Sequence, residues 1–265
     1  MKKLRIIGLA AIAIMPGFLK RPLYKWCFGY RIARNARIGV ALLDCAKLVV
    51  GDSARISHGT AFLRCGEVRI GERAIIGPLN LFRGGQLIDL GDYSQVMRMN
   101  IVNAIPDNDC TNNPESSFRL GYGSVVTAEH RIDFTDRVSI GRHSILGGRN
   151  SSIWTHNRRA GSPVTIGDYC YVASEIRMAP GAEVPDCCIV GLGSVVTGKM
   201  RESYSLLAGV PARRRRSLNA EDIELIFGKT RPDLPEEKYP EPPEEARAAS
   251  EGALRESEDI CHPSF

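Results

Sequence analysis

His156 is the residue of this sequence whose type and position are best suited to proton transfer. It stands in the segment Trp154-Thr155-His156-Asn157, inside a polar interruption of residues 151–163 that precedes a very regular stretch of chain. Imidazole gains and loses a proton near neutral pH, so a histidine placed in a loop can serve as a general base. The alternative interpretation is an ordinary polar residue in a loop corner.

A second candidate is the run of four arginines from Arg213 to Arg216. Guanidinium groups donate paired hydrogen bonds to phosphate oxygens, so such a run suits a phosphorylated ligand. The alternative is a solvated basic end of the domain. The whole chain carries a net charge of +5, although its last 34 residues hold ten acidic residues against three basic ones. A basic body fits an anionic partner.

The stretch 164–216 that lies between these candidates has a six-residue period. Apolar side chains recur in it at every sixth position: Ile166, Val172, Met178, Val184 and Val190. The residues four positions after them are mostly small. Neither a helix nor a simple strand resets every six residues. The period predicts a repeat fold, a parallel β-helix in which each coil buries its aliphatic residues against neighbouring coils.

The same six-residue pattern begins at Ile38 and continues, with shifts of phase, to residue 216. We therefore expect a β-helical domain over residues 38–216, in which inserted corner residues cause the shifts. Residues 104–118 are polar and rich in turn formers, which predicts one protruding loop that could cover a substrate. His130 occupies a position otherwise given to small inner residues. It is therefore either a buried structural histidine or a site residue.

Two ordered motifs close the repeat: Val190-Gly-Leu-Gly-Ser-Val-Val-Thr197, then Ala208-Gly-Val-Pro-Ala-Arg213. With them the chain resembles the hexapeptide-repeat acyltransferases, in particular O-acetyltransferases of the exopolysaccharide and maltose type. The resemblance implies an all-β, left-handed parallel β-helix. It also implies a homotrimer in which coenzyme A lies in the groove between neighbouring β-helices.

Site residues follow from the same resemblance. His156 would be the general base that takes the proton of an acceptor hydroxyl as it attacks the acetyl-CoA thioester, and His130, Asp133 and Asn157 are candidates for supporting roles. The implied coenzyme A contacts are Ser174, Leu192, Thr197, Lys199, Arg213 and Arg216. The sequence departs from the family pattern at Leu192, where alanine is more usual, and at Gly198, which is inserted before Lys199.

The function implied is transfer of an acetyl group from acetyl-CoA to a carbohydrate hydroxyl, with surface polysaccharide precursors as the preferred acceptors. An acetyltransferase for a small sugar or an antibiotic is the alternative, and a non-catalytic scaffold is another. No metal is expected, because the five histidines contain no H-x4-H pair of the kind found in β-helical carbonic anhydrases. No nucleic acid is expected either, since basic and aromatic residues form no binding motif.

Residues 1–37 contain nine Lys or Arg and no acidic residue. The apolar run 6–15 is too short to span a bilayer, and an aromatic and basic segment, 18–30, follows it. Three interpretations stay open: an anchor through residues 1–30 at the surface of a membrane, a helical cap on the β-helix, or a cleaved signal.

After the repeat, Asn219 is a suitable N-cap for a short helix within residues 217–230. Residues 231–265 are acidic, rich in Pro and without apolar period, which predicts a disordered tail. The eight cysteines include no CxxC pair. They indicate a reduced, cytoplasmic chain, in which the protein would lie free or at the cytoplasmic face of the membrane.

Overall fold

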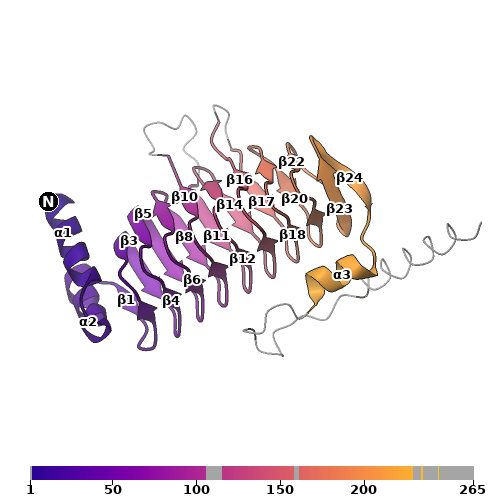
Figure 1. The fold of residues 1–265 in the computed structure, drawn as a ribbon. Helices are drawn as coiled ribbons and strands as arrows, with labels where there is room; N and C mark the ends of the chain where they lie inside the picture. The colour runs from indigo at the N-terminus through magenta and orange to yellow at the C-terminus, as the bar shows by residue number, and fades with distance from the viewer. Residues whose placement is uncertain (1, 106–114, 158–160, 229–233, 235–243, 245–265) are drawn as a thin grey trace, which may run out of the picture.

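The chain folds into a parallel β-helix of short strands with two helices at its N-terminal end (Figure 1). The computed structural model describes residues 2–105, 115–157, 161–228, 234 and 244. The chain winds round three faces, named I, II and III in the order of each coil, and equivalent strands of successive coils pair in parallel. The prediction of an all-β parallel β-helix is confirmed.

Each face is a ladder of short strands. Face I consists of β2 (Arg37–Ile38), β4 (Arg55–Ile56), β6 (Ile75–Ile76), β9 (Gln95–Val96), β12 (Val125–Val126), β15 (Ile145–Leu146), β18 (Tyr171–Val172), β21 (Ile189–Val190) and β23 (Ser205–Gly209). Two long strands, β3 (Leu42–Val50) and β5 (Ala61–Ile70), run across the corner between faces II and III. Face II continues with β7 (Leu81–Arg83), β10 (Ile101–Asn103), β13 (Arg131–Asp133), β16 (Ser152–Ile153), β19 (Arg177–Met178) and β22 (Val195–Val196). Face III contains β1 (Arg31–Ile32), β8 (Leu87–Leu90), β11 (Ser117–Leu120), β14 (Val138–Ile140), β17 (Val164–Ile166) and β20 (Glu183–Val184).

The core is a column of aliphatic side chains along the axis. All five aliphatic residues of the predicted period are at most 1% exposed: Ile166, Val172, Met178, Val184 and Val190. Each lies above its equivalent in the next coil, as Val172 pairs with Val190. In the early coils the rings of Phe62 and Phe82 stack in parallel, 4.5 Å between centroids. Since every coil contacts only its neighbours, this stacking supplies the burial that holds the coils together.

Coil length varies, and the long coils carry their extra residues at one corner. Val96 pairs with Val126, thirty residues on, whereas Val126 pairs with Leu146, twenty residues on. The extra residues lie between β10 and β11, and a second insertion lies between β16 and β17, so both leave the corner between faces II and III. The predicted C-terminal boundary of the loop 104–118 is two residues too late, because Ser117 and Phe118 belong to β11. Residues 106–114 of that loop lie outside the described residues.

Two helices, α1 (Lys2–Ala13) and α2 (Gly17–Phe28), cover the N-terminal end of the β-helix (Figure 1). Leu9, Ile12 and Tyr24 are buried in the same core cluster as the first coils. This is the packing expected of a cap. None of the helices in the described part of the chain is long and apolar enough to cross a membrane.

Polar contacts join the cap to the first coils. The Arg5 Nε donates to Asp44 at 2.8 Å, and the buried Lys20 ammonium donates to the carbonyls of Ile38 (3.0 Å) and Gly39 (2.6 Å). The β-helix itself begins earlier than the predicted residue 38, because β1 already pairs with β3 through Ile32 and Val50. Ile32 lies six residues before Ile38, but no glycine follows it.

The C-terminal end is closed by an antiparallel strand, β24 (Ala212–Ser217), which pairs with β23. The helix α3 (Ala220–Phe227) follows, and Asn219 and Asp222 form a capping box at its start. The ring of Phe227 stacks on Tyr169 with centroids 4.9 Å apart, so α3 folds back onto the last coils. The predicted disordered tail lies almost entirely outside the described residues.

Candidate functional site

The structure brings His156 and Asp133 together at the corner between faces II and III. Asp133 is the last residue of β13, and His156 follows β16, the strand stacked on β13 in the next coil. The His156 Nδ1 lies 2.5 Å from the Asp133 Oδ2. The carboxylate accepts this hydrogen bond, so Nδ1 carries a proton, and in the neutral ring the acceptor lone pair is on Nε2. The pair therefore presents a basic nitrogen at the protein surface.

Asp133 is fixed by further hydrogen bonds. Its Oδ1 accepts from the backbone N–H of Thr135 at 2.9 Å and from the hydroxyl of Thr155 at 3.0 Å. The Thr155 hydroxyl in turn accepts from the backbone N–H of Asp136 at 2.9 Å. The Asp133 side chain is 7% exposed, whereas that of His156 is 40% exposed. A buried carboxylate thus orients an accessible imidazole, an arrangement in which the imidazole can act as a general base.

The insertion that follows His156 is tied to the same corner. The Asp136 Oδ2 accepts from the backbone N–H of Ser162 at 2.5 Å. The Asn157 side-chain amide donates to the Ser162 Oγ at 2.6 Å. The ring of Trp154 meets His156 edge-on, with centroids 5.7 Å apart. The structure therefore places Asn157 at the base of the insertion next to His156.

The earlier long loop is anchored beside the same pair. Ile105, two residues after β10, donates its N–H to the Thr135 hydroxyl at 2.8 Å, and Ser116 at the other end of the loop donates its hydroxyl to the Thr135 carbonyl at 2.6 Å. Thr135 also donates to Asp133. Both insertions of the β-helix thus leave from the coils that hold the His156–Asp133 pair. The roles of Thr135, Thr155 and Asp136 were not predictable, because each contact joins neighbouring coils.

His130 lies inside the β-helix, in a ladder of polar side chains at the corner between faces I and II. Each side chain of this ladder accepts a backbone N–H from the next coil: Asn80 from Asn100, Asn100 from His130, His130 from Ser151 and Ser151 from Ile176. The His130 Nε2 contacts the Thr127 hydroxyl at 3.0 Å. Burial lowers the pKa of His130 to about 4. Its two ring nitrogens are therefore engaged away from His156, as a structural histidine would be.

The predicted coenzyme A contacts fall into two groups on different corners. Ser174 and Leu192 lie at the corner between faces I and II, where the Gly193 N–H donates to the Ser174 carbonyl at 3.1 Å. Arg213, on β24, pairs with Ala208 and extends this group. Thr197 and Lys199 follow β22, at the corner of His156 two coils further on.

Several predicted cofactor residues have intramolecular partners. The Lys199 ammonium lies 3.1 Å from Glu183, and Arg216 forms an ion pair with Asp222 of α3. Leu192 is exposed. Arg213 is exposed and has no carboxylate partner in the described part of the chain, so its guanidinium is available to an anion. Among the residues that the structure describes, no cluster of His, Cys, Asp or Glu is arranged to hold a metal ion.

No family model matches this chain. The galactoside O-acetyltransferase of Escherichia coli (strain K12) is 25% identical to it over 115 residues, which are 42% of this chain and 56% of the relative. The match thus spans about half the length of that curated relative. The sequence resemblance to acetyltransferases therefore extends beyond the closing motifs.

Solved structures with a similar arrangement include three acyl- or acetyltransferases. The polysialic acid O-acetyltransferase OatWY has a TM-score of 0.49 at 16% identity, over 71% of this chain and 84% of that one. The polySia-specific acetyltransferase NeuO has a TM-score of 0.44 at 14% identity, over 71% and 80%. The UDP-N-acetylglucosamine O-acyltransferase LpxA of Moraxella catarrhalis RH4 has a TM-score of 0.42 at 18% identity, over 74% and 75%.

Proposed function

We propose that this protein is an acyl-CoA-dependent O-acyltransferase that moves an acetyl group from acetyl-CoA to a carbohydrate hydroxyl. The observation that carries the proposal is the His156–Asp133 pair, in which an accessible imidazole nitrogen faces outward and a buried carboxylate holds its partner nitrogen. The similarity to the galactoside O-acetyltransferase supports the reaction class.

In the proposed reaction, the His156 Nε2 accepts the proton of the acceptor hydroxyl while the oxygen of that hydroxyl attacks the thioester carbonyl. The imidazolium that forms is stabilised by Asp133. When the tetrahedral intermediate collapses, the C–S bond breaks and the imidazolium returns the proton to the departing thiolate. The products are an acetyl ester and free coenzyme A.

Acetyl-CoA would be held by the residues of the two corners, with Arg213 at its phosphates. His156 and the group of Ser174, Leu192 and Arg213 lie at opposite edges of face II within one chain. A groove between neighbouring β-helices would bring the base of one chain to the cofactor contacts of the next. For this reason we propose the homotrimer, and light scattering that finds a fully active monomer would contradict it.

The proposed activity is tested by incubating the purified protein with acetyl-CoA and a panel of galactosides, other small sugars and polysaccharides. Released coenzyme A is measured with a thiol reagent, and the acetylated sugar by mass spectrometry. We expect transfer to at least one acceptor and a rise in melting temperature with coenzyme A. If neither is observed, the protein is a scaffold and the proposed function is wrong. Acceptors of the small-sugar and polysaccharide classes are distinguished in the same panel.

Replacing Asp133 by asparagine should lower kcat by up to about 10⁴-fold, because the amide neither fixes the Nδ1–H tautomer nor stabilises the imidazolium. The KM for acetyl-CoA should change little. Asp168→Asn is a matched control, because Asp168 accepts a backbone N–H at an equivalent kind of corner but is remote from His156. A variant with an unchanged kcat would show that Asp133 does not position the base.

A further inference from the structure

The outer surfaces of α1 and α2 remain strongly apolar after the cap has formed. Their inner residues Leu9, Ile12 and Tyr24 are buried against the first coils, so the exposed apolar residues are additional to the packing. Phe18 is 78% and Trp26 80% exposed, and the other exposed apolar residues are Leu4, Ile6, Ile7, Ile14, Met15 and Leu19. A group of large exposed side chains of this size at one end of a molecule marks an interaction surface.

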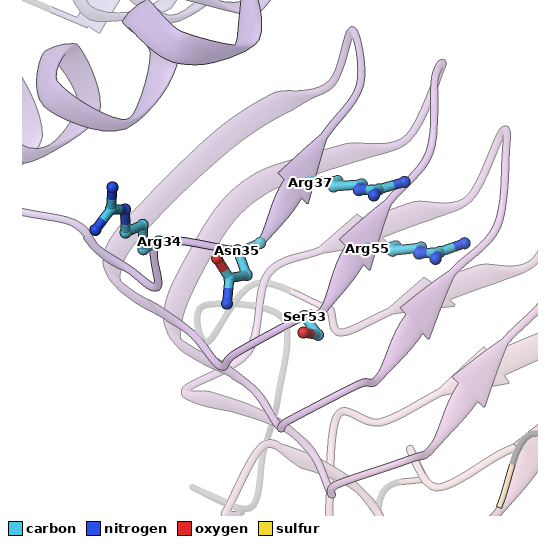
Figure 2. Close-up of a pocket in the computed structure, with 6 residues that line it drawn as sticks. Arg34, Asn35, Arg37, Ser53 and Arg55 are labelled. Carbon is cyan, nitrogen blue, oxygen red and sulfur yellow. The ribbon is translucent and has the colours of Figure 1, made fainter.

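A collar of cations surrounds this end of the β-helix. Three cavities lie there, of about 410, 580 and 470 Å³, and each is lined by basic side chains. The members of the collar are Arg21, Lys25, Arg31, Arg34, Arg37 and Arg55. Figure 2 shows Arg37 and Arg55 extending side by side from neighbouring strands of face I. Six positively charged side chains therefore lie around this end of the β-helix.

The collar is poorly neutralised by the protein itself. Residues 1–37 contain no acidic residue. No ion pair is formed by Arg34, Arg37 or Arg55 with any carboxylate in the described ranges of the chain. The cavity lined by Arg34, Arg37 and Arg55 has no carboxylate among its lining residues. The Asp52 carboxylate accepts from two of its lining residues, Ser53 at 3.1 Å and Asn35 at 3.5 Å. The positive charge at this end is therefore available to an external anion.

We propose that the N-terminal end of the β-helix docks on an anionic membrane surface. The apolar residues of α1 and α2 enter the boundary between headgroups and acyl chains, while the collar binds lipid phosphates. Aromatic and aliphatic side chains beside Lys and Arg are the composition of interfacial anchors. A second copy of the chain that docked end to end through this surface would be repelled, because the two collars carry the same charge. In this proposal the inner surfaces of α1 and α2 cap the β-helix, and their outer surfaces contact the membrane.

The proposal is tested by flotation of the full chain with vesicles of phosphatidylcholine alone or with an equal amount of phosphatidylglycerol. We expect binding to the anionic vesicles and a loss of binding in high salt. Two variants separate the contributions: Phe18→Ser with Trp26→Ser, and Arg37→Gln with Arg55→Gln. Each should weaken partitioning by on the order of tenfold or more. Arg98→Gln with Arg201→Gln removes the same charge elsewhere and should bind as the unmodified chain does.

Fluorescence reports the depth of insertion, because the chain has two tryptophans. In a Trp154→Phe variant, Trp26 emission should shift to the blue on anionic vesicles and be quenched by brominated acyl chains. All these substitutions are at exposed positions, and circular dichroism checks that each variant is folded. The proposal would be overturned if the protein does not bind vesicles, or if the control pair of substitutions weakens binding as much as the test pairs do. It would also be overturned if the protein is a dimer in solution that Phe18→Ser with Trp26→Ser dissociates. His156→Ala should bind vesicles normally, so docking and catalysis can fail separately.

Discussion

Replacing His156 by alanine is expected to lower kcat by roughly two to four orders of magnitude. An alcohol is a poor nucleophile at neutral pH, and the other described histidines, His58, His130 and His143, lie at other corners of the β-helix. Binding of coenzyme A should persist, because the residues assigned to it lie at other positions. The measurement is the initial rate of thiol release at saturating acetyl-CoA, together with the rise in melting temperature that coenzyme A produces.

Two further measurements make this expectation specific. His143→Asn is the matched control: His143 lies in a corner with a φ of 52°, a conformation that asparagine tolerates, and its ring stacks on Tyr169. This variant should keep its activity. Added imidazole should partly restore the His156→Ala variant, since the missing side chain was 40% exposed and leaves an accessible space. An unchanged rate in His156→Ala would show that another group is the base.

The parts of the fold that depend on local pattern were predictable. An aliphatic residue at every sixth position defines which side chains point inward, and each of these from Ile166 to Val190 is buried. The helix α3 was also predictable, because the side chain of its N-cap residue Asn219 accepts the backbone N–H of Asp222 in the first turn. The same logic located the insertion that contains His156, since the period stops there and starts again at Val164.

Contacts that join one coil to another were not predictable. Asp133 and His156 are 23 residues apart, and their meeting depends on the exact length of the coil between them. That length is set by insertions that do not follow the period. The same applies to Thr155 and Thr135, whose hydroxyls form hydrogen bonds with residues of neighbouring coils. The N-terminal cap was one of three open interpretations, because a helix with apolar residues all round does not reveal which side will be buried.

His130 illustrates how a tertiary ladder overrides a local rule. The period reserves its position for small residues, yet Asn80 and Asn100 occupy the equivalent places in the two preceding coils. The shared feature is an acceptor atom that receives the backbone N–H of the next coil. The imidazole Nδ1 fulfils this role for Ser151 at 3.1 Å. His130 is therefore neutral in the folded protein at neutral pH, because a protonated Nδ1 would lose its role as acceptor.

This neutrality makes the stability of the β-helix dependent on pH. The pKa of His130 is about 4 when folded, against an ordinary value of 6.5. Between these values the unfolded chain binds a proton that the folded chain does not, so stability falls as the pH is lowered. The contribution of neutral His130 to the free energy of unfolding is complete above pH 6.5 and is lost by about pH 4. At about 1.4 kcal/mol per pKa unit the loss amounts to about 3 kcal/mol.

The variant His130→Asn isolates this effect, because asparagine already serves at the same position of two neighbouring coils and does not titrate. Urea unfolding of both proteins should be measured at about pH 7 and about pH 5, where the histidine contribution differs by about 2 kcal/mol. The variant should lose less stability than the unmodified protein on acidification, although other groups titrate equally in both. Equal losses in the two proteins would mean that His130 can take up a proton while folded, and that Ser151 has another acceptor. The ladder would then be a matter of packing, with hydrogen bonding contributing little.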